Sequence, residues 1–183
     1  MNLSEPIKKF CFLFFLFLSL TSLRCGKGPK EVPQKPAFDF SLPDLNGKIW
    51  SMNDCQGQVV VLSFWATWCP PCVEEVPKLS NLYLKYRSQG VQVIGIALDK
   101  NNLDLLGQFV RGHGISYPVL VGTEQILANL HATPAGKNLK GVPATFIFDQ
   151  RGQVYKRFDG SFDPEQMEES LQTLLAAQKT KTK

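Results

Sequence analysis

This chain of 183 residues lacks the residue groups that most metal sites and nucleic-acid surfaces need. It has five cysteines but only one closely spaced pair, and its two histidines, His113 and His131, stand alone. A zinc site needs further soft ligands at matching spacing, so no metal is expected. The 20 basic residues only slightly outnumber the 16 acidic ones and are mostly scattered. Nucleic acid is therefore not an expected partner.

The chain also lacks a hydrophobic run long enough for a dedicated transmembrane helix. As a helix, Phe10–Leu23 would span only about 21 Å, against a hydrocarbon core of roughly 30 Å. Lys8 and Lys9 precede this run. A basic start followed by an apolar stretch is the pattern of a secretory signal. Residues 1–25 are therefore expected to be a signal peptide, or a lipoprotein or signal-anchor segment, outside the folded domain.

Cys25 ends this segment in a context that resembles a bacterial lipoprotein processing site, in which the cysteine is acylated. Arg24 departs from that pattern, because a small residue usually precedes the cysteine. An incidental cysteine close to the membrane is the alternative. Residues 26–37 are polar and rich in Pro and Gly, which is typical of a flexible tether. We expect a domain over residues 38–178, anchored on the extracytoplasmic or periplasmic side of the cell envelope, and a disordered tail over 179–183.

Cys69 and Cys72, separated by Pro70 and Pro71, are the most informative residues of the sequence. They follow an apolar run that begins at Val59, and they open a helix-forming stretch. Unpaired N–H groups and the helix dipole favour an anion at a helix N-terminus, so the first cysteine is expected to react as a thiolate. The second, about one turn on, can reach back and close a disulfide. The pattern predicts thiol–disulfide chemistry.

The two prolines between the cysteines limit the stabilisation of the thiolate. Proline has no backbone N–H, so two donors that could solvate the sulfur at the helix start are missing. Less thiolate stabilisation makes the dithiol form a stronger reductant, and each 1.4 kcal/mol corresponds to roughly 30 mV. The sequence therefore predicts a reductant or mild exchanger rather than a disulfide donor.

Strand and helix patterns alternate along the domain. Residues 38–51 alternate apolar and polar positions around a turn sequence, which predicts a hairpin. The other expected elements are strands at 59–64, 91–97, 117–121, 144–148 and 153–157, and helices at 70–87, 103–111, 123–130 and 163–178. This order predicts the α/β class, with a mixed central β-sheet flanked by helices and an extra N-terminal β-hairpin.

The motif residues resemble the active-site strand and helix of thioredoxin-like proteins. More specifically, they are similar to the membrane-tethered TlpA/ResA type, within the redoxin and AhpC/TSA-related superfamily. The resemblance rests on Phe64–Cys72, on the opening hairpin, on Glu75 and Pro77, and on Gly141–Phe146. It extends over nearly everything from Phe38 to Leu175, and it implies a thioredoxin-like fold.

This resemblance also implies roles for individual residues. Cys69 would be the nucleophile and Cys72 the resolving thiol, with their redox-active disulfide in place of any other cofactor. A cis peptide bond is implied between Val142 and Pro143. It would leave the backbone of Val142 exposed beside the disulfide, where an extended substrate segment can pair with it.

The neighbours of the cysteine pair are the further candidates for substrate binding. Pro70 and Pro71 lie between the two thiols. Trp68 either shapes the docking surface or is a buried aromatic. Cys55 has no partner close in sequence, and we expect a half-buried structural residue rather than a second resolving thiol.

Glu75 stands three residues after Cys72 on the same helical face. Its carboxyl could relay the proton of the resolving thiol, or it could be a first-turn acid favoured by the helix dipole. Glu74 is expected to point elsewhere into solvent. Thioredoxins carry a buried Asp on the preceding strand, where this chain has Ser63. That difference favours a proton-transfer role for Glu75.

Three functions fit these observations. The first is an exported, membrane-tethered reductase of disulfides in envelope proteins, with electrons from a membrane donor and apocytochrome c as a candidate substrate. The second is a thiol peroxidase of the redoxin branch, which needs Thr or Ser three residues before its reactive cysteine, where Ala66 stands. The third is a copper carrier, which needs a wider cysteine spacing and a positioned histidine.

Overall fold

The computed structural model describes residues 35–99 and 102–181. Residues 1–25, with the expected signal segment and Cys25, lie outside the described residues, as do most of the expected tether and the last two residues. Within the described ranges, no helix combines the length and the apolar character that a membrane crossing requires.

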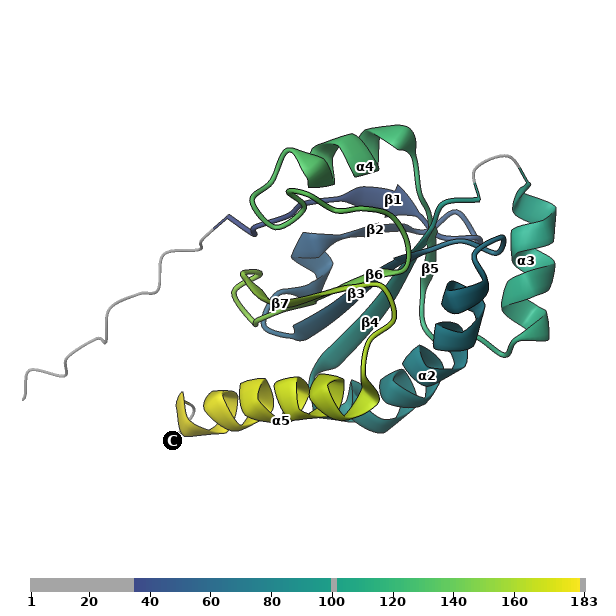
Figure 1. The fold of residues 1–183 in the computed structure, drawn as a ribbon. Coiled ribbons are helices and arrows are strands. Elements are labelled where there is room, and N and C mark those ends of the chain that lie inside the picture. The colour runs from purple at the N-terminus through teal and green to yellow at the C-terminus, as the bar shows by residue number, and fades with distance from the viewer. Residues whose placement is uncertain (1–34, 100–101, 182–183) are drawn as a thin grey trace, which may run out of the picture. The chain divides into compact units, whose positions relative to one another are not determined.

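A five-stranded mixed sheet lies at the centre of the described domain, with the strand order β5-β4-β3-β6-β7 (Figure 1). Its strands are β3 (Val59–Trp65), β4 (Val91–Ala97), β5 (Val119–Val121), β6 (Ala144–Phe148) and β7 (Val154–Asp159). Strands β3, β4 and β5 are parallel, whereas β6 runs antiparallel to both β3 and β7. Both faces of β3 are buried, which explains why Ser63 is its one polar residue.

The expected N-terminal hairpin forms a separate two-stranded antiparallel sheet from β1 (Ser41–Pro43) and β2 (Ile49–Ser51). Its turn is held by the carboxylate of Asp44, which accepts hydrogen bonds from the backbone N–H groups of Asn46 and Lys48. A short 3-10 helix, η2 (Met52–Cys55), leads from the hairpin towards the central sheet.

Four α-helices and a second 3-10 helix complete the described domain. They are α2 (Pro70–Tyr86), η3 (Arg87–Gln89), α3 (Leu103–Gly112), α4 (Glu124–His131) and α5 (Pro164–Lys181). The expected strands and helices are confirmed, with boundaries that shift by up to three residues. The expectation of a disordered tail was wrong for residues 179–181, because α5 continues to Lys181.

The alternating side chains of β3 divide the core into two layers. Val59, Val61 and Trp65 face a cluster that includes side chains of α2, α3 and α5. Val60, Leu62 and Phe64 face the opposite cluster, which is built with the hairpin segment and α4. The domain is thus an α/β structure with helices on both faces of a mixed sheet, as predicted.

The parallel strands β3 and β4 both end at one edge of the sheet. The loop to α2 leaves β3 there, and Leu98 and Asp99 follow β4. The Leu98 N–H donates to the carbonyl of Trp65, which joins the two strand ends. This edge is where functional residues of α/β folds commonly gather.

Candidate active site

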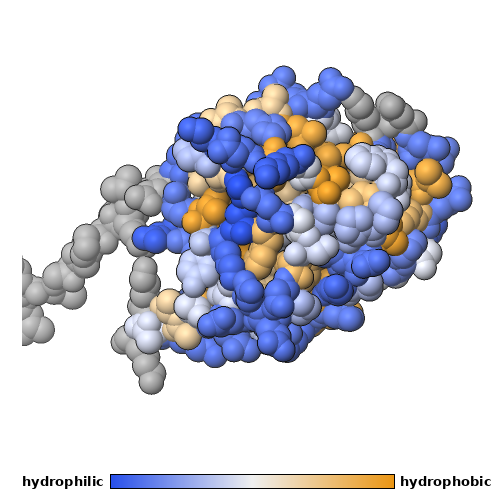
Figure 2. Space-filling view, in the orientation of Figure 1, coloured by the Kyte–Doolittle hydropathy of each residue, from blue (hydrophilic) through white to orange (hydrophobic). Residues whose placement is uncertain are grey.

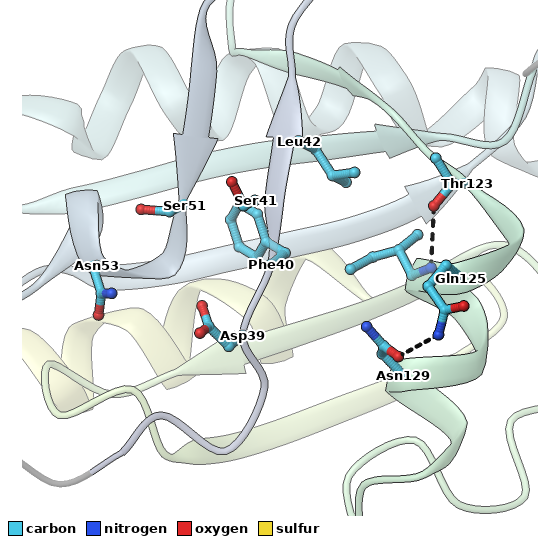
Figure 3. A pocket seen from close by; sticks show the side chains of 10 residues that line it. Asp39, Phe40, Ser41, Leu42, Ser51, Asn53, Thr123, Gln125 and Asn129 are labelled. Carbon is cyan, nitrogen blue, oxygen red and sulfur yellow. Dashed lines mark hydrogen bonds between the residues drawn. The ribbon is translucent and has the colours of Figure 1, made fainter.

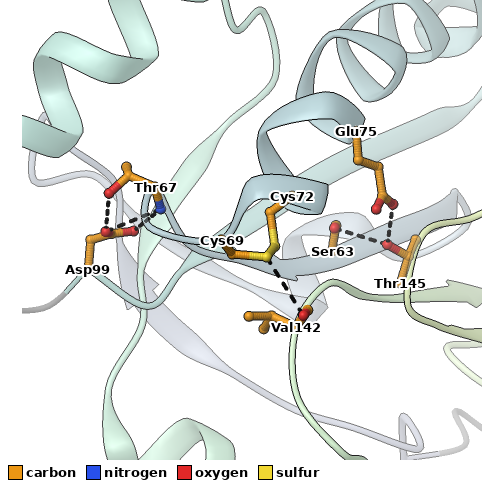
Figure 4. Close-up of a disulfide and its surroundings, with 8 residues drawn as sticks. All are labelled: Ser63, Thr67, Cys69, Cys72, Glu75, Asp99, Val142 and Thr145. Carbon is orange, nitrogen blue, oxygen red and sulfur yellow. Dashed lines mark hydrogen bonds between the residues drawn. A yellow bond between two sulfur atoms is a disulfide. The ribbon is translucent and has the colours of Figure 1, made fainter.

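Cys69 and Cys72 form a disulfide at the start of α2 (Figure 4). Cys69 is the N-cap residue of the helix and Cys72 lies in its first turn, with 5.3 Å between their Cα atoms. Cys69 exposes 5% of its surface, and Cys72 exposes none. Cys69 is therefore the sulfur that an incoming group can reach first.

The start of α2 offers no free N–H group to the Cys69 sulfur. Its first two helical residues are Pro70 and Pro71, as the sequence required. The next two N–H groups, of Cys72 and Val73, both donate to the Cys69 carbonyl, at 3.0 and 3.1 Å. The backbone donors that stabilise a thiolate at other helix starts are missing or occupied here.

The loop before β6 approaches the disulfide from the other side. The peptide bond between Val142 and Pro143 is cis, as the sequence analysis expected. The Val142 carbonyl oxygen lies 3.7 Å from the Cys69 sulfur (Figure 4). A carbonyl only accepts hydrogen bonds, so it favours a thiol at Cys69 over a thiolate. The Pro143 carbonyl accepts from the Gly160 N–H at 2.9 Å, which ties this loop to the end of β7.

Trp68 is one of the most exposed large apolar residues described, with 67% of its surface accessible. This exposure excludes the expectation that Trp68 is a buried aromatic. Pro70 and Pro71 are exposed as well. Hydrophobic residues also reach the surface near α3, whereas the lower edge along α5 is mostly hydrophilic (Figure 2).

Glu75 lies on the buried face of α2, with 2% of its surface exposed, whereas Glu74 is exposed to solvent as expected. The Thr145 hydroxyl oxygen lies 3.2 Å from Glu75 Oε1 and 3.0 Å from the Ser63 hydroxyl. These three side chains form one chain of hydrogen bonds across β3 and β6 (Figure 4). Burial raises the pKa of Glu75 from 4.5 to about 7, although the Thr145 hydrogen bond and the charge of Lys78 act in the opposite direction.

Asp99 is a site residue that the sequence analysis missed. Its carboxylate accepts hydrogen bonds from the Thr67 backbone N–H at 3.0 Å and from the Thr67 hydroxyl at 2.5 Å. These bonds fix the loop that carries Trp68 and Cys69. The signal was available, because Asp99 follows β4 at the same sheet edge as the cysteine pair.

The two histidines and Cys55 do not take part in the contacts around the disulfide. His113 and His131 are exposed, and the His113 ring stacks on Phe109. Cys55 is free and fully buried rather than half-buried, and burial raises its thiol pKa to about 11. Among the residues that the structure describes, no three His, Cys, Asp or Glu side chains are grouped to hold a metal ion.

A hollow of about 600 Å³ lies between the hairpin segment and α4 (Figure 3). Its walls combine apolar side chains such as Phe40 and Ile126 with polar ones such as Asp39, Asn53 and Asn129. None of the residues that line it belongs to the disulfide region. The chemistry of the described domain therefore points to the disulfide region as the candidate active site.

Comparison with known proteins agrees with this geometry. The AhpC/TSA family model matches residues 33–157. The thiol-disulfide oxidoreductase ResA of Geobacillus kaustophilus is 30% identical over 138 residues, which cover 75% of each chain. ResA of Bacillus cereus (strain ATCC 10987 / NRS 248) is 34% identical over 142 residues, covering 76% of this chain and 77% of that protein.

Solved structures show the same fold. A thiol:disulfide interchange protein of the thioredoxin family from Chlorobium tepidum superposes with a TM-score of 0.68 at 27% sequence identity. The match covers 79% of this chain and 99% of that structure. The expected thioredoxin-like fold is confirmed.

Proposed function

The chain belongs to the AhpC/TSA family and is a thiol–disulfide oxidoreductase, and from this premise we propose that it is an exported, membrane-tethered reductant of disulfides in envelope proteins. The observation that carries the reducing direction is the start of α2. Neither Pro70 nor Pro71 has an N–H, and the N–H groups of Cys72 and Val73 are already bonded to the Cys69 carbonyl.

This helix start affects the redox balance through the thiolate. A strongly oxidising protein holds its dithiol form by stabilising the thiolate of the first cysteine. Here the helix dipole remains, but direct N–H donation to the sulfur is absent, and the Val142 carbonyl is an acceptor. A less stabilised thiolate shifts the couple towards the disulfide, so the reduced protein gives up its electrons more readily.

The proposed reaction runs through a mixed disulfide. The Cys69 thiolate attacks one sulfur of the substrate disulfide, and the other substrate sulfur leaves as a thiolate and takes up a proton. The Cys72 thiolate then attacks Cys69, which closes the Cys69–Cys72 disulfide and releases the second substrate thiol. Two electrons and two protons pass to the substrate, and a membrane-embedded donor would restore the dithiol.

Glu75 would accept the proton that Cys72 loses in the second step. A group with a pKa of about 7 can both take and release a proton near neutral pH. The Thr145 hydroxyl has a single hydrogen, so it donates to the carboxylate when Glu75 is charged, while the Ser63 hydroxyl donates to Thr145. Because these hydroxyls can reorient, Glu75 Oε1 keeps a hydrogen-bond partner whether the carboxyl is charged or neutral.

Two features next to Cys69 support recognition of protein substrates. The backbone at Val142, beside the cis bond, can pair with an extended segment, and Trp68 with Pro70 and Pro71 offers an exposed apolar surface. We assign the substrate class to extended segments of disulfide-containing envelope proteins. Apocytochrome c is a candidate substrate, since haem attachment requires reduced cysteines.

The extracytoplasmic location rests on the sequence of residues 1–25. The basic start and apolar run indicate export, and acylation of Cys25 would hold the domain at the membrane surface. An uncleaved signal segment is the other anchor that this sequence allows.

The peroxidase alternative is disfavoured by the residues before Cys69. Ala66 has no hydroxyl to offer a peroxide, and the neighbouring Thr67 hydroxyl is bound to Asp99. The copper-carrier alternative is disfavoured by the two-residue spacing of the cysteines and by the position of His113 and His131 on the surface.

Trapping of substrates tests the proposal. In a Cys72→Ser variant the first step proceeds but the second cannot, so envelope proteins should accumulate as mixed disulfides on Cys69. The matched Cys69→Ser variant should trap none of them. Equal trapping by both variants, or trapping of no protein by either, would refute the proposed reductase function.

A further inference from the structure

Three buried polar atoms close to the active site lack a hydrogen-bond partner within the described part of the chain. They are the indole Nε1 of Trp65, the second carboxylate oxygen of Glu75 and the hydroxyl of Tyr117. Buried polar groups are rarely left unpaired, since each costs roughly 1–3 kcal/mol when its hydrogen bond is missing. Three such groups in one region call for a common partner.

The strand register brings these atoms to one place. Thr145, Ser63, Gly95 and Val119 are paired in one row across β6, β3, β4 and β5. Neighbouring strands are about 4.8 Å apart, and the paired residues of a row share a face. Ser63 and Thr145 form the floor beneath Glu75. Gly95 is the next position of that floor and has no side chain.

Trp65 and Tyr117 both extend over Gly95. A Cβ atom placed on Gly95 would lie 2.5 Å from Trp65 Nε1 and 2.8 Å from the Tyr117 ring. The carboxylate of Glu75 also helps to raise the pKa of the Tyr117 hydroxyl, after the larger effect of burial, so the two groups lie within electrostatic range of each other. The Trp65 indole N–H and the Tyr117 ring thus lie over the one glycine of the row, and Glu75 lies beside Thr145 of the same row.

We propose that Trp65 Nε1, Tyr117 OH and Glu75 Oε2 together bind one buried water molecule above Gly95, and that Tyr117 is thereby a positioning residue for the Glu75 carboxylate. Buried waters typically make about three hydrogen bonds to groups that are otherwise unpaired. The indole N–H can only donate and a charged carboxylate can only accept, so the water is oriented between them. The inference rests on the proposed proton-transfer role of Glu75 and deepens it.

The electrostatic surroundings of Glu75 favour a detectable effect. The titratable groups that interact with it electrostatically are Lys78 from α2 and Tyr117 from the segment before β5. From β3 and β6 it meets only the uncharged hydroxyls of Ser63 and Thr145. Hydrogen bonds donated to the carboxylate lower its pKa, so their loss should raise it.

The test is a titration of the Glu75 carboxyl carbon by NMR in the oxidised protein, with Tyr117→Phe as the variant. We expect the pKa of Glu75 to rise by about one relative to the unsubstituted protein. Tyr86→Phe is the matched control, because Tyr86 is buried in the same core cluster but its hydroxyl contacts Glu168. An unchanged or lowered Glu75 pKa in Tyr117→Phe would overturn the proposal.

A second measurement needs no variant. In the unsubstituted protein, the indole hydrogen of Trp65 should show a nuclear Overhauser effect to a long-lived water, and its absence would refute the proposal even if Tyr117→Phe failed to fold. Neither readout requires turnover. Failure of the proposed reductase function would therefore appear in the trapping experiment and leave these two results unaffected.

Discussion

At the scale of single residues, Glu75 is buried at a helix position where a glutamate is usually exposed to solvent. A glutamate in the first turns of a helix is ordinarily a solvated acid favoured by the dipole. Here it lies on the buried face of α2 and is hydrogen-bonded to Thr145, and burial raises its pKa to about 7. A carboxyl kept protonated until neutral pH must lower the stability of the fold when it finally ionises.

We predict that the free energy of unfolding falls between pH 4.5 and 7 because of Glu75. The unfolded chain releases this proton near its ordinary pKa of 4.5, while the folded protein keeps it until about 7. Rising pH therefore favours the unfolded state, by roughly 3 kcal/mol in total, and the effect levels off above pH 7. Urea unfolding at a series of pH values measures this slope.

The Glu75→Gln variant should lose that slope, and the matched Glu74→Gln variant, altered at an exposed neighbour, should keep it. The same slope in both variants would show that Glu75 ionises normally.

At the scale of elements, the proposed function depends on the start of α2 for its redox character and on the loop before β6 for pairing with the substrate. The first depends on backbone donors that two prolines remove. The second depends on Arg157 of β7, whose guanidinium donates to the carbonyls of Ala135 and Lys137 at 2.8 and 2.9 Å and to the Asp159 carboxylate at 2.7 Å. Arg157 thus ties the segment that leads to Val142 to the sheet.

Replacing the second proline should make the protein more oxidising. Pro71→Ala restores an N–H at the helix start, which should lower the pKa of the Cys69 thiol and raise the reduction potential, by roughly 30 mV for each 1.4 kcal/mol of added thiolate stabilisation. The ultraviolet absorbance of the thiolate, followed against pH in the reduced protein, measures this pKa. Pro77→Ala, further along the same helix, is the control and should leave it unchanged. A Cys69 pKa that is identical in all three proteins would contradict the argument.

Loosening the Arg157 contacts should affect protein substrates selectively. In Arg157→Gln the loop before β6 loses two charge-assisted hydrogen bonds, so the KM for a disulfide-containing peptide should rise, by up to about tenfold for 1.4 kcal/mol of lost positioning. Exchange with dithiothreitol, which needs no backbone pairing, should stay at its original rate. Parallel loss of both activities would mean that Arg157 acts on the disulfide itself.

At the scale of the whole molecule, the sequence predicted the order of elements well, because each follows from a local pattern. The mainly apolar sequence of β3 and the helical spacing after Cys72 can be recognised without tertiary information. The contacts that complete the site were harder to foresee. Asp99 bonds to Thr67 from 32 positions away, and Thr145 reaches Glu75 from 70 positions away. Only the strand pairing brings these residues together, and a single sequence does not state it.

The proposed attachment to the membrane concerns the chain as a whole. If Cys25 carries the lipid, the protein should incorporate a labelled fatty acid and stay in the membrane fraction. Cys25→Ser should then abolish the label. Retention of the label would disprove acylation at Cys25, whereas an unlabelled parent protein that stays in the membrane fraction would favour the uncleaved signal segment.

The reduction potential of the Cys69–Cys72 couple tests the central claim most directly. Equilibration of the purified protein with dithiothreitol buffers of graded ratio gives the fraction oxidised and hence the potential. We predict a reducing value, near the roughly −270 mV of thioredoxin. A value near the roughly −120 mV of the strongest periplasmic oxidants, or a pair that fails to equilibrate with the dithiol, would contradict the account.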